Sequence, residues 1–175
     1  MSERVYVQML VQFGKIKEVF DQVSRSENVV KAFMCTGDFD ILLKVEVNDT
    51  GILAAFLTDK LEGVQGTIKS KTFLVLKNCE SSSPPNENRK TKAFVFIDAE
   101  QKALKVFNSI VEWQKKDESF IRDVSLITGE HDLIVDLALT DLDEVGTFIT
   151  TYLSKLEGVI RTYTFVSFEN LPNST

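Results

Sequence analysis

The sequence predicts an α+β protein made of two tandem ferredoxin-like units, each with the element order βαββαβ. The first observation is an internal repeat: Thr-Gly-Asp-Phe-Asp at residues 36–40 returns as Thr-Gly-Glu-His-Asp at residues 128–132, a shift of 92 residues. The same shift aligns Asp49 with Asp141 without a gap. The second observation is that both copies show the same order of strand and helix patterns, and the third is a polar segment between them. Repetition of one small unit therefore sets the architecture.

The first copy contains six predicted elements. They are, in order, a strand at 5–11, a helix at 16–23, strands at 29–35 and 41–47, a helix from 49 to 61 and a strand at 68–76. Ile16, Val19 and Val23 recur at helical spacing, and Asp49 is a good N-cap for the second helix. Apolar side chains alternate through 41–47, and this period of two is typical of a strand with two different faces.

The second copy repeats this order. It contains a strand at 93–97, a helix opening near 98 and running through 113, strands at 121–127 and 133–139, a helix from 141 or 143 to 153, a strand at 159–168 and a polar tail at 169–175. Asp98 with Gln101 resembles a capping box at the start of the first helix. This helix, or the loop after it, is longer than in the first copy.

A polar segment separates the copies. Residues 81–85 read Ser-Ser-Ser-Pro-Pro, which cannot join a sheet or the interior of a helix. We therefore predict a first domain at 1–77, a flexible linker at 78–91 and a second domain at 92–175. Each copy is small enough that its core alone is thin, so we expect the copies to pair with each other or with other chains.

In each predicted unit both helices lie on one face of a four-stranded sheet, and the other face needs a cover. That face still carries apolar residues such as Leu42 and Ile134. Face-to-face packing of the two sheets would supply the cover and would form a pseudodimeric α+β barrel.

Matching positions of the two copies carry opposite charges. Lys31 corresponds to Asp123, and Lys44 corresponds to Asp136. Opposite charges at matching positions would favour pairing of the first copy with the second. Ordinary variation of surface charge is the simpler alternative.

Composition argues against several functional classes. The net charge is −6 and basic residues do not cluster in a long stretch, so direct binding to nucleic acid is not expected. No apolar run is long enough to span a membrane, and the first residues do not form a signal peptide, so we expect a cytoplasmic protein with no membrane partner. Cys35 and Cys79 lack metal-ligand spacing and are expected to be reduced thiols.

Two motifs resemble the effector domain of the Lrp/AsnC family of regulators. They are a strand leading into Thr-Gly-x-x-Asp and a last strand entered through Gly-Val-x-x-Thr-x-Thr. The second motif reads Gly-Val-Ile-Arg-Thr-Tyr-Thr at residues 158–164, and the looser first copy reads Gly-Thr-Ile-Lys-Ser-Lys-Thr at residues 66–72. The resemblance covers both copies, because each motif occurs twice at matching positions.

The resemblance implies a function. Family members bind small effectors, typically amino acids, where modules meet, and they assemble into rings of paired modules. Family regulators also carry a helix-turn-helix domain before this module, whereas the first predicted strand here begins within a few residues of Met1. We therefore expect a homo-oligomeric sensing module without its own DNA-binding domain, which acts through a partner such as a DNA-binding relative.

The candidate ligand-binding residues lie in the two Thr-Gly-x-x-Asp turns and in the last strand of each copy. The simpler interpretation is structural: Gly supplies a positive φ, Asp caps the turn, and Thr is a good strand residue. The functional interpretation adds backbone N–H groups that hold a carboxylate and an acid that pairs with an ammonium group. The resemblance places effector contacts around these turns and the last-strand hydroxyl groups. The candidates are Thr36, Gly37, Asp38, Asp40, Ser70, Thr72, Thr128, Gly129, Glu130, His131, Asp132, Thr162 and Thr164.

His131 is the only histidine. A single imidazole without a Cys or acid cluster does not indicate a metal or haem site, so no metal and no cofactor are expected. His131 replaces Phe39 of the first copy, and Glu130 replaces Asp38, so the two turns should not bind a ligand identically.

Three functional classes follow from these observations. The first is an amino-acid sensing and assembly module, and the second is a structural adaptor without a ligand, if the turn residues only make turns. The third is a small α+β barrel enzyme. The sequence argues against the enzyme because it shows no base–nucleophile set, no suitable acid pair and no phosphate-binding loop, so no catalytic residues are expected.

Overall fold

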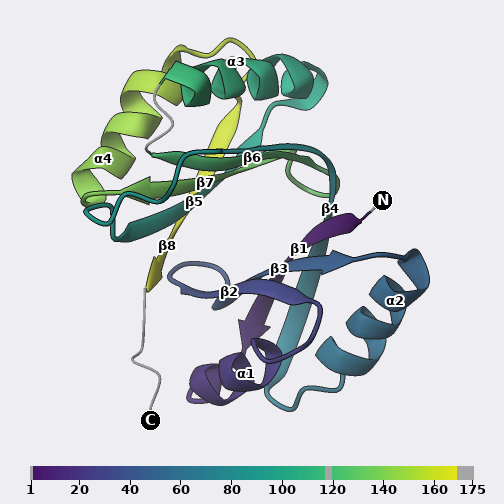
Figure 1. The fold of residues 1–175 in the computed structure, drawn as a ribbon. Coiled ribbons are helices and arrows are strands. Elements are labelled where there is room, and N and C mark those ends of the chain that lie inside the picture. Colours follow the sequence, from purple (N-terminus) through teal and green to yellow (C-terminus); the bar gives the residue numbers. More distant parts are fainter. Residues whose placement is uncertain (1, 117–119, 169–175) are drawn as a thin grey trace. The chain divides into compact units, whose positions relative to one another are not determined.

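A computed structural model describes residues 2–116 and 120–168. The chain divides into two compact units, Met1–Val75 and Leu76–Thr175 (Figure 1). Each unit has an antiparallel sheet with two helices, in the predicted order βαββαβ. The prediction of two tandem ferredoxin-like units is therefore confirmed, while face-to-face pairing of their sheets stays a prediction.

The first unit runs from β1 into β4. Its elements are β1 (Glu3–Val11), α1 (Ile16–Val23), β2 (Val29–Cys35), β3 (Ile41–Val47), α2 (Thr50–Ala55) with the π-helical turn Phe56–Leu61, and β4 (Thr67–Glu80). β1 pairs antiparallel with β3 and β4, and β3 pairs with β2, so the strand order is β2-β3-β1-β4. The first and third strands of the unit are thus central, as in a split β-α-β arrangement.

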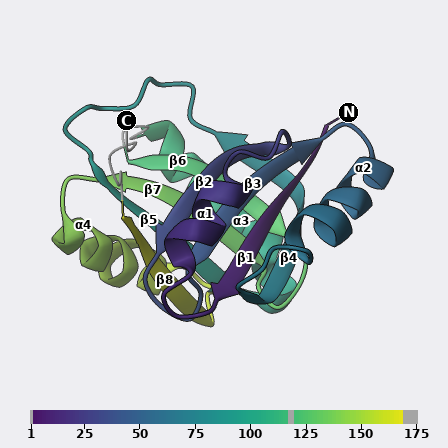
Figure 2. The same cartoon turned by 90° about the horizontal axis from the view of Figure 1, so that it is seen from below.

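The core of the first unit lies between its sheet and its helices. Val7 and Met9 of β1 alternate onto this face, where they pack in one buried cluster with Val19 and Val23 of α1. Phe56 joins this cluster from the second helix. Figure 2 looks onto the helix-covered face of this unit, with α1 in front of the strands.

The second unit repeats the arrangement with a longer first helix. Its elements are β5 (Thr91–Asp98), a 3₁₀ turn (Glu100–Lys102), α3 (Ala103–Lys116), β6 (Ile121–Ile127), β7 (Leu133–Leu139), α4 (Leu142–Thr147), a π-helical turn (Phe148–Tyr152), a 3₁₀ turn (Leu153–Lys155) and β8 (Arg161–Phe168). β5 pairs with β7 and β8, and β7 pairs with β6, which gives the order β8-β5-β7-β6. Helix α3 has 14 residues and α1 has 8, so the longer connection predicted for this copy is helical.

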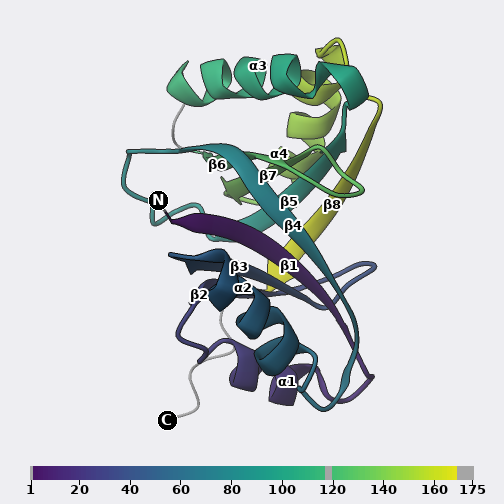
Figure 3. The ribbon, with the colours of Figure 1, turned by 90° about the vertical axis from the view of Figure 1, so that its right-hand side faces the viewer.

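The core of the second unit follows the same rule. Val95 and Ile97 of β5 face Val106, Phe107 and Ile110 of α3 in one buried cluster. Figure 3 shows α3 and α4 on the same side of this unit's sheet. The opposite face of the sheet therefore holds the alternate side chains of each strand.

The predicted linker at 78–91 begins within a strand, and its flexibility stays a prediction. β4 continues to Glu80, so residues 78–80 of the predicted linker belong to a strand. Beyond it, Ser81 N donates to Arg122 O (2.8 Å), and Arg122 Nη2 donates to Ser83 O (2.7 Å). The predicted tail at 169–175 lies outside the described residues.

The second helix of each unit begins at the predicted aspartate. Asp49 Oδ1 accepts hydrogen bonds from Gly51 N (2.6 Å) and Ile52 N (3.1 Å). Asp141 Oδ1 accepts from Glu144 N at 3.1 Å. These contacts satisfy N–H groups that have no partner inside the helix.

In the part of the chain that the structure describes, no helix has both the length and the apolar character needed to cross a membrane.

Candidate functional site

The two Thr-Gly-x-x-Asp motifs form the β2–β3 turn of the first unit and the β6–β7 turn of the second. Gly37 and Gly129 each have φ of 118°, a backbone conformation that L side chains rarely adopt. Thr36 and Thr128 precede these glycines in the turns. Glycine is therefore required by the turn geometry itself.

The last aspartate of each motif fastens its turn to the end of a central strand. Asp40 Oδ2 accepts a hydrogen bond from Val11 N (2.8 Å) at the end of β1. Asp132 Oδ2 accepts two, from Ala99 N (2.7 Å) and Glu100 N (2.9 Å), just after β5. This supports the structural interpretation of both aspartates. It also gives the second turn a direct connection to the start of the α3 region.

His131 contacts an acid and two aromatic rings in the second unit. Its Nδ1 lies 2.7 Å from Asp98 Oδ1, and its ring centroid lies 4.7 Å from that of Tyr163 and 5.3 Å from that of Phe96. Glu130 Oε1 lies 3.8 Å from His131 Nε2. We call these five residues the His131 cluster.

The hydrogen bond to Asp98 fixes the chemistry of the imidazole. An ionised carboxylate only accepts, so Nδ1 of His131 carries the proton. Nε2 is then the acceptor in the neutral ring and a second donor in the protonated ring. Nε2 is also the ring nitrogen that lies near the carboxylate of Glu130.

Strand register separates the last-strand hydroxyl groups from this cluster. Tyr163 lies opposite Phe96, whereas Thr162 lies opposite Ile97 and Thr164 opposite Val95. Because directly paired residues share one face of a sheet, both threonines lie on the face that the helices cover. The structure thus places Thr162 and Thr164 on the other side of the sheet from His131.

The first unit shows the same separation. Ser70 lies opposite Met9, and Thr72 lies opposite Val7, whose side chains belong to the core under the helices. The structure therefore groups the turn residues of each unit but does not bring the four last-strand candidates to the open face beside them. Asp38 is exposed within its turn.

Two members of the His131 cluster, Asp98 and Tyr163, are not among the residues predicted from the sequence. The pattern Asp98-x-x-Gln101 predicts a capping box, but Asp98 binds His131, and the carboxylate of Asp132 takes the N–H groups of the next two residues. The capping-box prediction is wrong for this reason. The signal for Tyr163 was its position between two threonines, since alternation places it on the opposite face.

The thiol near the first turn, that of Cys35, is buried. Burial raises the pKa of the Cys35 thiol to about 12, so the reactive thiolate is suppressed. Within residues 2–116 and 120–168, no group of three or more His, Cys, Asp or Glu side chains could hold a metal ion.

Comparisons with known proteins agree with the repeated fold. The model of the Lrp/AsnC ligand binding domain matches residues 4–85 and again residues 92–175. The HTH-type transcriptional regulator FL11 of Pyrococcus furiosus is 31% identical over 74 residues, which are 41% of this chain and 47% of that protein. The chain spans about half the length of the curated relatives it matches.

Two solved structures are similar over 95% of the chain. They are the siroheme decarboxylase NirDL, with a TM-score of 0.66 over 71% of that chain, and a putative monooxygenase from Lactobacillus acidophilus NCFM, with a TM-score of 0.63 over 93% of that chain. Their sequence identities of 10% and 8% show a shared fold only. The family matches cover both units, and we conclude that the chain belongs to the Lrp/AsnC ligand-binding domain family and carries two copies of that domain.

Proposed function

We propose that the chain is an amino-acid sensing and oligomerisation module that acts through partner proteins. The observation that carries this proposal is the double match to a ligand-binding domain, in which each copy has its own Thr-Gly-x-x-Asp turn. Domains of this family are regulatory, and their effectors include amino acids. The proposed partner is a DNA-binding relative, because the acidic chain itself is poorly suited to phosphate binding.

The second turn has groups that complement both ends of an amino acid. In the described part of the chain, the N–H of Gly129 donates to no acceptor, so it is available to a ligand carboxylate. Glu130 lies beside it with a carboxylate for the ammonium group, and Nε2 of His131 faces Glu130 at 3.8 Å. Thr128 precedes the glycine and contributes a hydroxyl group to the same turn.

The contacts of Asp132 supply a route for the response. Its carboxylate joins the turn to Ala99 and Glu100, which lead into α3. A ligand that tightens the turn would therefore stabilise the beginning of the α3 region. Assembly contacts that include α3 would then depend on the ligand through differential affinity of the two states.

A thermal-shift screen of the purified chain against the twenty amino acids tests this proposal. An effector at 100 times its Kd stabilises the folded state by about 2.7 kcal/mol, which raises Tm by roughly 5–10 °C for a chain of this size. We expect a shift for one chemical group of amino acids. We also expect His131→Phe to reduce the shift, because phenylalanine keeps a ring but loses the hydrogen bond to Asp98.

The alternative is an adaptor without a ligand. The structural role of Asp40 and Asp132 favours it, because both carboxylates are used within the turns. A screen without any shift would support the adaptor. We further propose that the chain is not an enzyme, and a substrate turned over by the purified protein would contradict that.

A further inference from the structure

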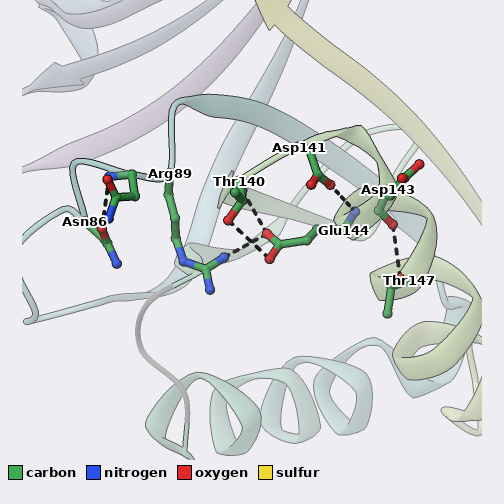
Figure 4. Close-up of polar contacts among 8 residues, drawn as sticks. Asn86, Arg89, Thr140, Asp141, Asp143, Glu144 and Thr147 are labelled. Carbon is green, nitrogen blue, oxygen red and sulfur yellow. Dashed lines mark hydrogen bonds and ion pairs between the residues drawn. The ribbon is translucent and has the colours of Figure 1, made fainter.

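The second unit contains a cavity on its helix side, away from the residues of the His131 cluster. Its volume is about 130 Å³, and it shares no residue with that cluster. Counted as the space open to the centre of a water-sized sphere, a single water needs about 10–15 Å³. The cavity is therefore large enough for a small metabolite and too small for a nucleotide. The charged residues at its edge appear in Figure 4.

Three aromatic rings line the cavity, those of Phe120, Phe148 and Tyr152. The Phe120 centroid lies 5.8 Å from that of Phe148 and 6.0 Å from that of Tyr152, and the last two rings stack at 6.1 Å. Leu139 completes the apolar lining. Rings that contact one another in this way form a rigid apolar surface, which suits a branched or unbranched hydrocarbon side chain.

An ion pair forms the polar edge of the cavity. Arg89 Nη1 donates to Glu144 Oε2 at 2.9 Å, and the guanidinium carbon lies 6.0 Å from the Phe120 ring centroid. Glu144 is held by Thr140, whose N–H donates to Oε2 at 2.9 Å (Figure 4). The cation and the anion therefore lie side by side in a fixed geometry.

Both charged groups keep binding capacity. The guanidinium group of arginine has five N–H donors. Among the described residues, the Arg89 side chain donates one hydrogen bond, to Glu144, and this side chain is only 17% exposed. Partly buried donors of this kind favour an acceptor from water or a ligand. The second oxygen of Glu144, Oε1, accepts from Thr140 Oγ1 at 3.3 Å and has a further lone pair.

We propose that this cavity is a second small-molecule site that binds a zwitterionic amino acid with an apolar side chain. The ligand carboxylate pairs with Arg89, the ammonium group pairs with Glu144, and the side chain lies against the aromatic rings. A zwitterion adds no net charge, which matters because Asp141 and Asp143 lie close to Glu144 (Figure 4). This second site shares no residue with the turn site.

The first unit supplies a natural control. At the positions that correspond to Phe120, Glu144 and Tyr152 in the repeat, it has Asn28, Ile52 and Lys60. The first unit keeps a ring only at Phe56, which matches Phe148, so two of the three rings and the acid are missing there. Any binding that depends on them must come from the second unit.

The single tryptophan is a built-in reporter for this cavity. Trp113 of α3 lies 5.4 Å from the Tyr152 ring, edge to face, and Tyr152 lines the cavity. We would titrate the full chain with L-leucine, L-methionine and L-valine, and follow Trp113 fluorescence and the heat of binding. Saturable binding of at least one of them is expected, while 4-methylpentanoate (no ammonium), leucinamide (no carboxylate) and glycine (no side chain) bind more weakly.

Variants assign the binding to this cavity. Arg89→Gln and Glu144→Gln should each weaken binding roughly 10- to 100-fold, because each removes a charge-assisted contact. Thr147→Phe should block the cavity, since Thr147 lines it. His131→Phe, which alters only the turn site, should leave the Trp113 signal unchanged.

Three outcomes would overturn the inference. They are no saturable binding of any of the three amino acids, unchanged binding in both Arg89→Gln and Glu144→Gln, and loss of the signal in His131→Phe. The first two would leave the ion pair as a simple connection between the inter-repeat segment and α4. The third would assign the ligand to the turn. Circular dichroism of each variant separates lost binding from lost folding, and Glu144→Gln keeps an oxygen for Thr140 if Arg89→Gln does not fold.

Discussion

The first unit places Phe39 in its β2–β3 turn, where the second unit places His131 in its β6–β7 turn. The backbone of the two turns is the same, with φ of 118° at Gly37 and Gly129. The surroundings differ, because Asp98 accepts from His131 in the second unit and Leu10 takes the matching place in the first. The strand registers set this match: the preceding residues, Met9 and Ile97, lie opposite Ile41 and Leu133, which correspond in the repeat. The fold thus conserves the turn between its two copies while the chemistry beside it changes.

The helix sides of the two units also differ. The first unit has an open cavity of about 470 Å³ beside its second helix, lined mainly by polar and charged groups that include Arg25, Glu27 and Lys60. The cavity of the second unit is smaller and aromatic. Two copies of one domain therefore carry different cavities on their helix sides.

The largest loss of stability is expected from substituting the glycine before β8, Gly158, and the matching glycine before β4, Gly66. Gly158→Ala should destabilise the chain by about 2–4 kcal/mol, because φ is +108° and the added Cβ would lie 2.7 Å from Lys102 Cβ. Gly66→Ala meets Lys15 Cβ at 3.1 Å and should cost about 1–3 kcal/mol. Urea unfolding of both variants measures this, and an equal or smaller cost for Gly158→Ala would contradict the expected order.

The turn aspartates give the next comparison. Asp132→Ala leaves two backbone N–H groups without their acceptor and should cost about 2–3 kcal/mol, whereas Asp40→Ala leaves one and should cost about 1–2 kcal/mol. Chemical denaturation checks the values. Asp→Asn at each position is the control, since its amide oxygen still accepts. An unchanged free energy of unfolding in Asp132→Ala would show that these hydrogen bonds contribute little to stability.

Local chemistry explains which parts of this structure the sequence could predict. Asp49 and Asp141 cap helices that begin at the next residue. Gly37 and Gly129 are required by the positive φ of their own turns. Those features need no knowledge of distant residues. Alternation and helical spacing likewise predicted the order of elements in both units.

The features that the sequence did not predict depend on distant partners. Asp98 matches a local capping pattern, yet it binds His131, which is 33 residues away. Arg89 meets Glu144 across 55 residues, and nothing in the basic run around residue 89 indicates that partner. The last-strand threonines look suitable as ligand contacts until strand register places Thr162 opposite Ile97.

The charge pattern of the two units gives a third comparison. Lys31 lies opposite Lys44 in the first unit, and Asp123 lies opposite Asp136 in the second, so like charges are neighbours within each sheet. If copy one pairs with copy two, Lys44→Asp should destabilise the chain by about 1–2 kcal/mol, and Asp136→Lys should restore it.

If the two copies do not pair, the stability effect of Lys44→Asp should have the opposite sign. Without such pairing, Lys44→Asp replaces a like pair by an opposite pair within the first sheet, and this change should be neutral or stabilising. Thermal unfolding of the two single variants and the double variant distinguishes these cases. Absence of rescue in the double variant would sink the pairing hypothesis.

The smallest expected effect concerns Glu157, whose matching residue in the first unit is the uncharged Gln65. Hydrogen bonds from Lys102 and Lys105 lower the pKa of the Glu157 carboxyl to about 2 from its usual 4.5. A lowered folded-state pKa gives stability that is present above pH 4.5 and is lost as pH falls towards 2. Glu157→Gln should remove a small, salt-sensitive part of that pH dependence, because the group is exposed. Unfolding curves from pH 2 to 7 at low salt check this, and identical curves for both proteins would contradict it.

The most direct test of the account is a calorimetric titration of the wild type, His131→Phe and Phe39→His with the amino acid that the thermal screen identifies. The central claim is that the second turn senses the effector and the first does not sense it in the same way. We expect binding about tenfold weaker in His131→Phe and unchanged in Phe39→His, because the first turn has Leu10 where the second has Asp98. Unchanged affinity in His131→Phe, or an equal loss in both variants, would contradict it.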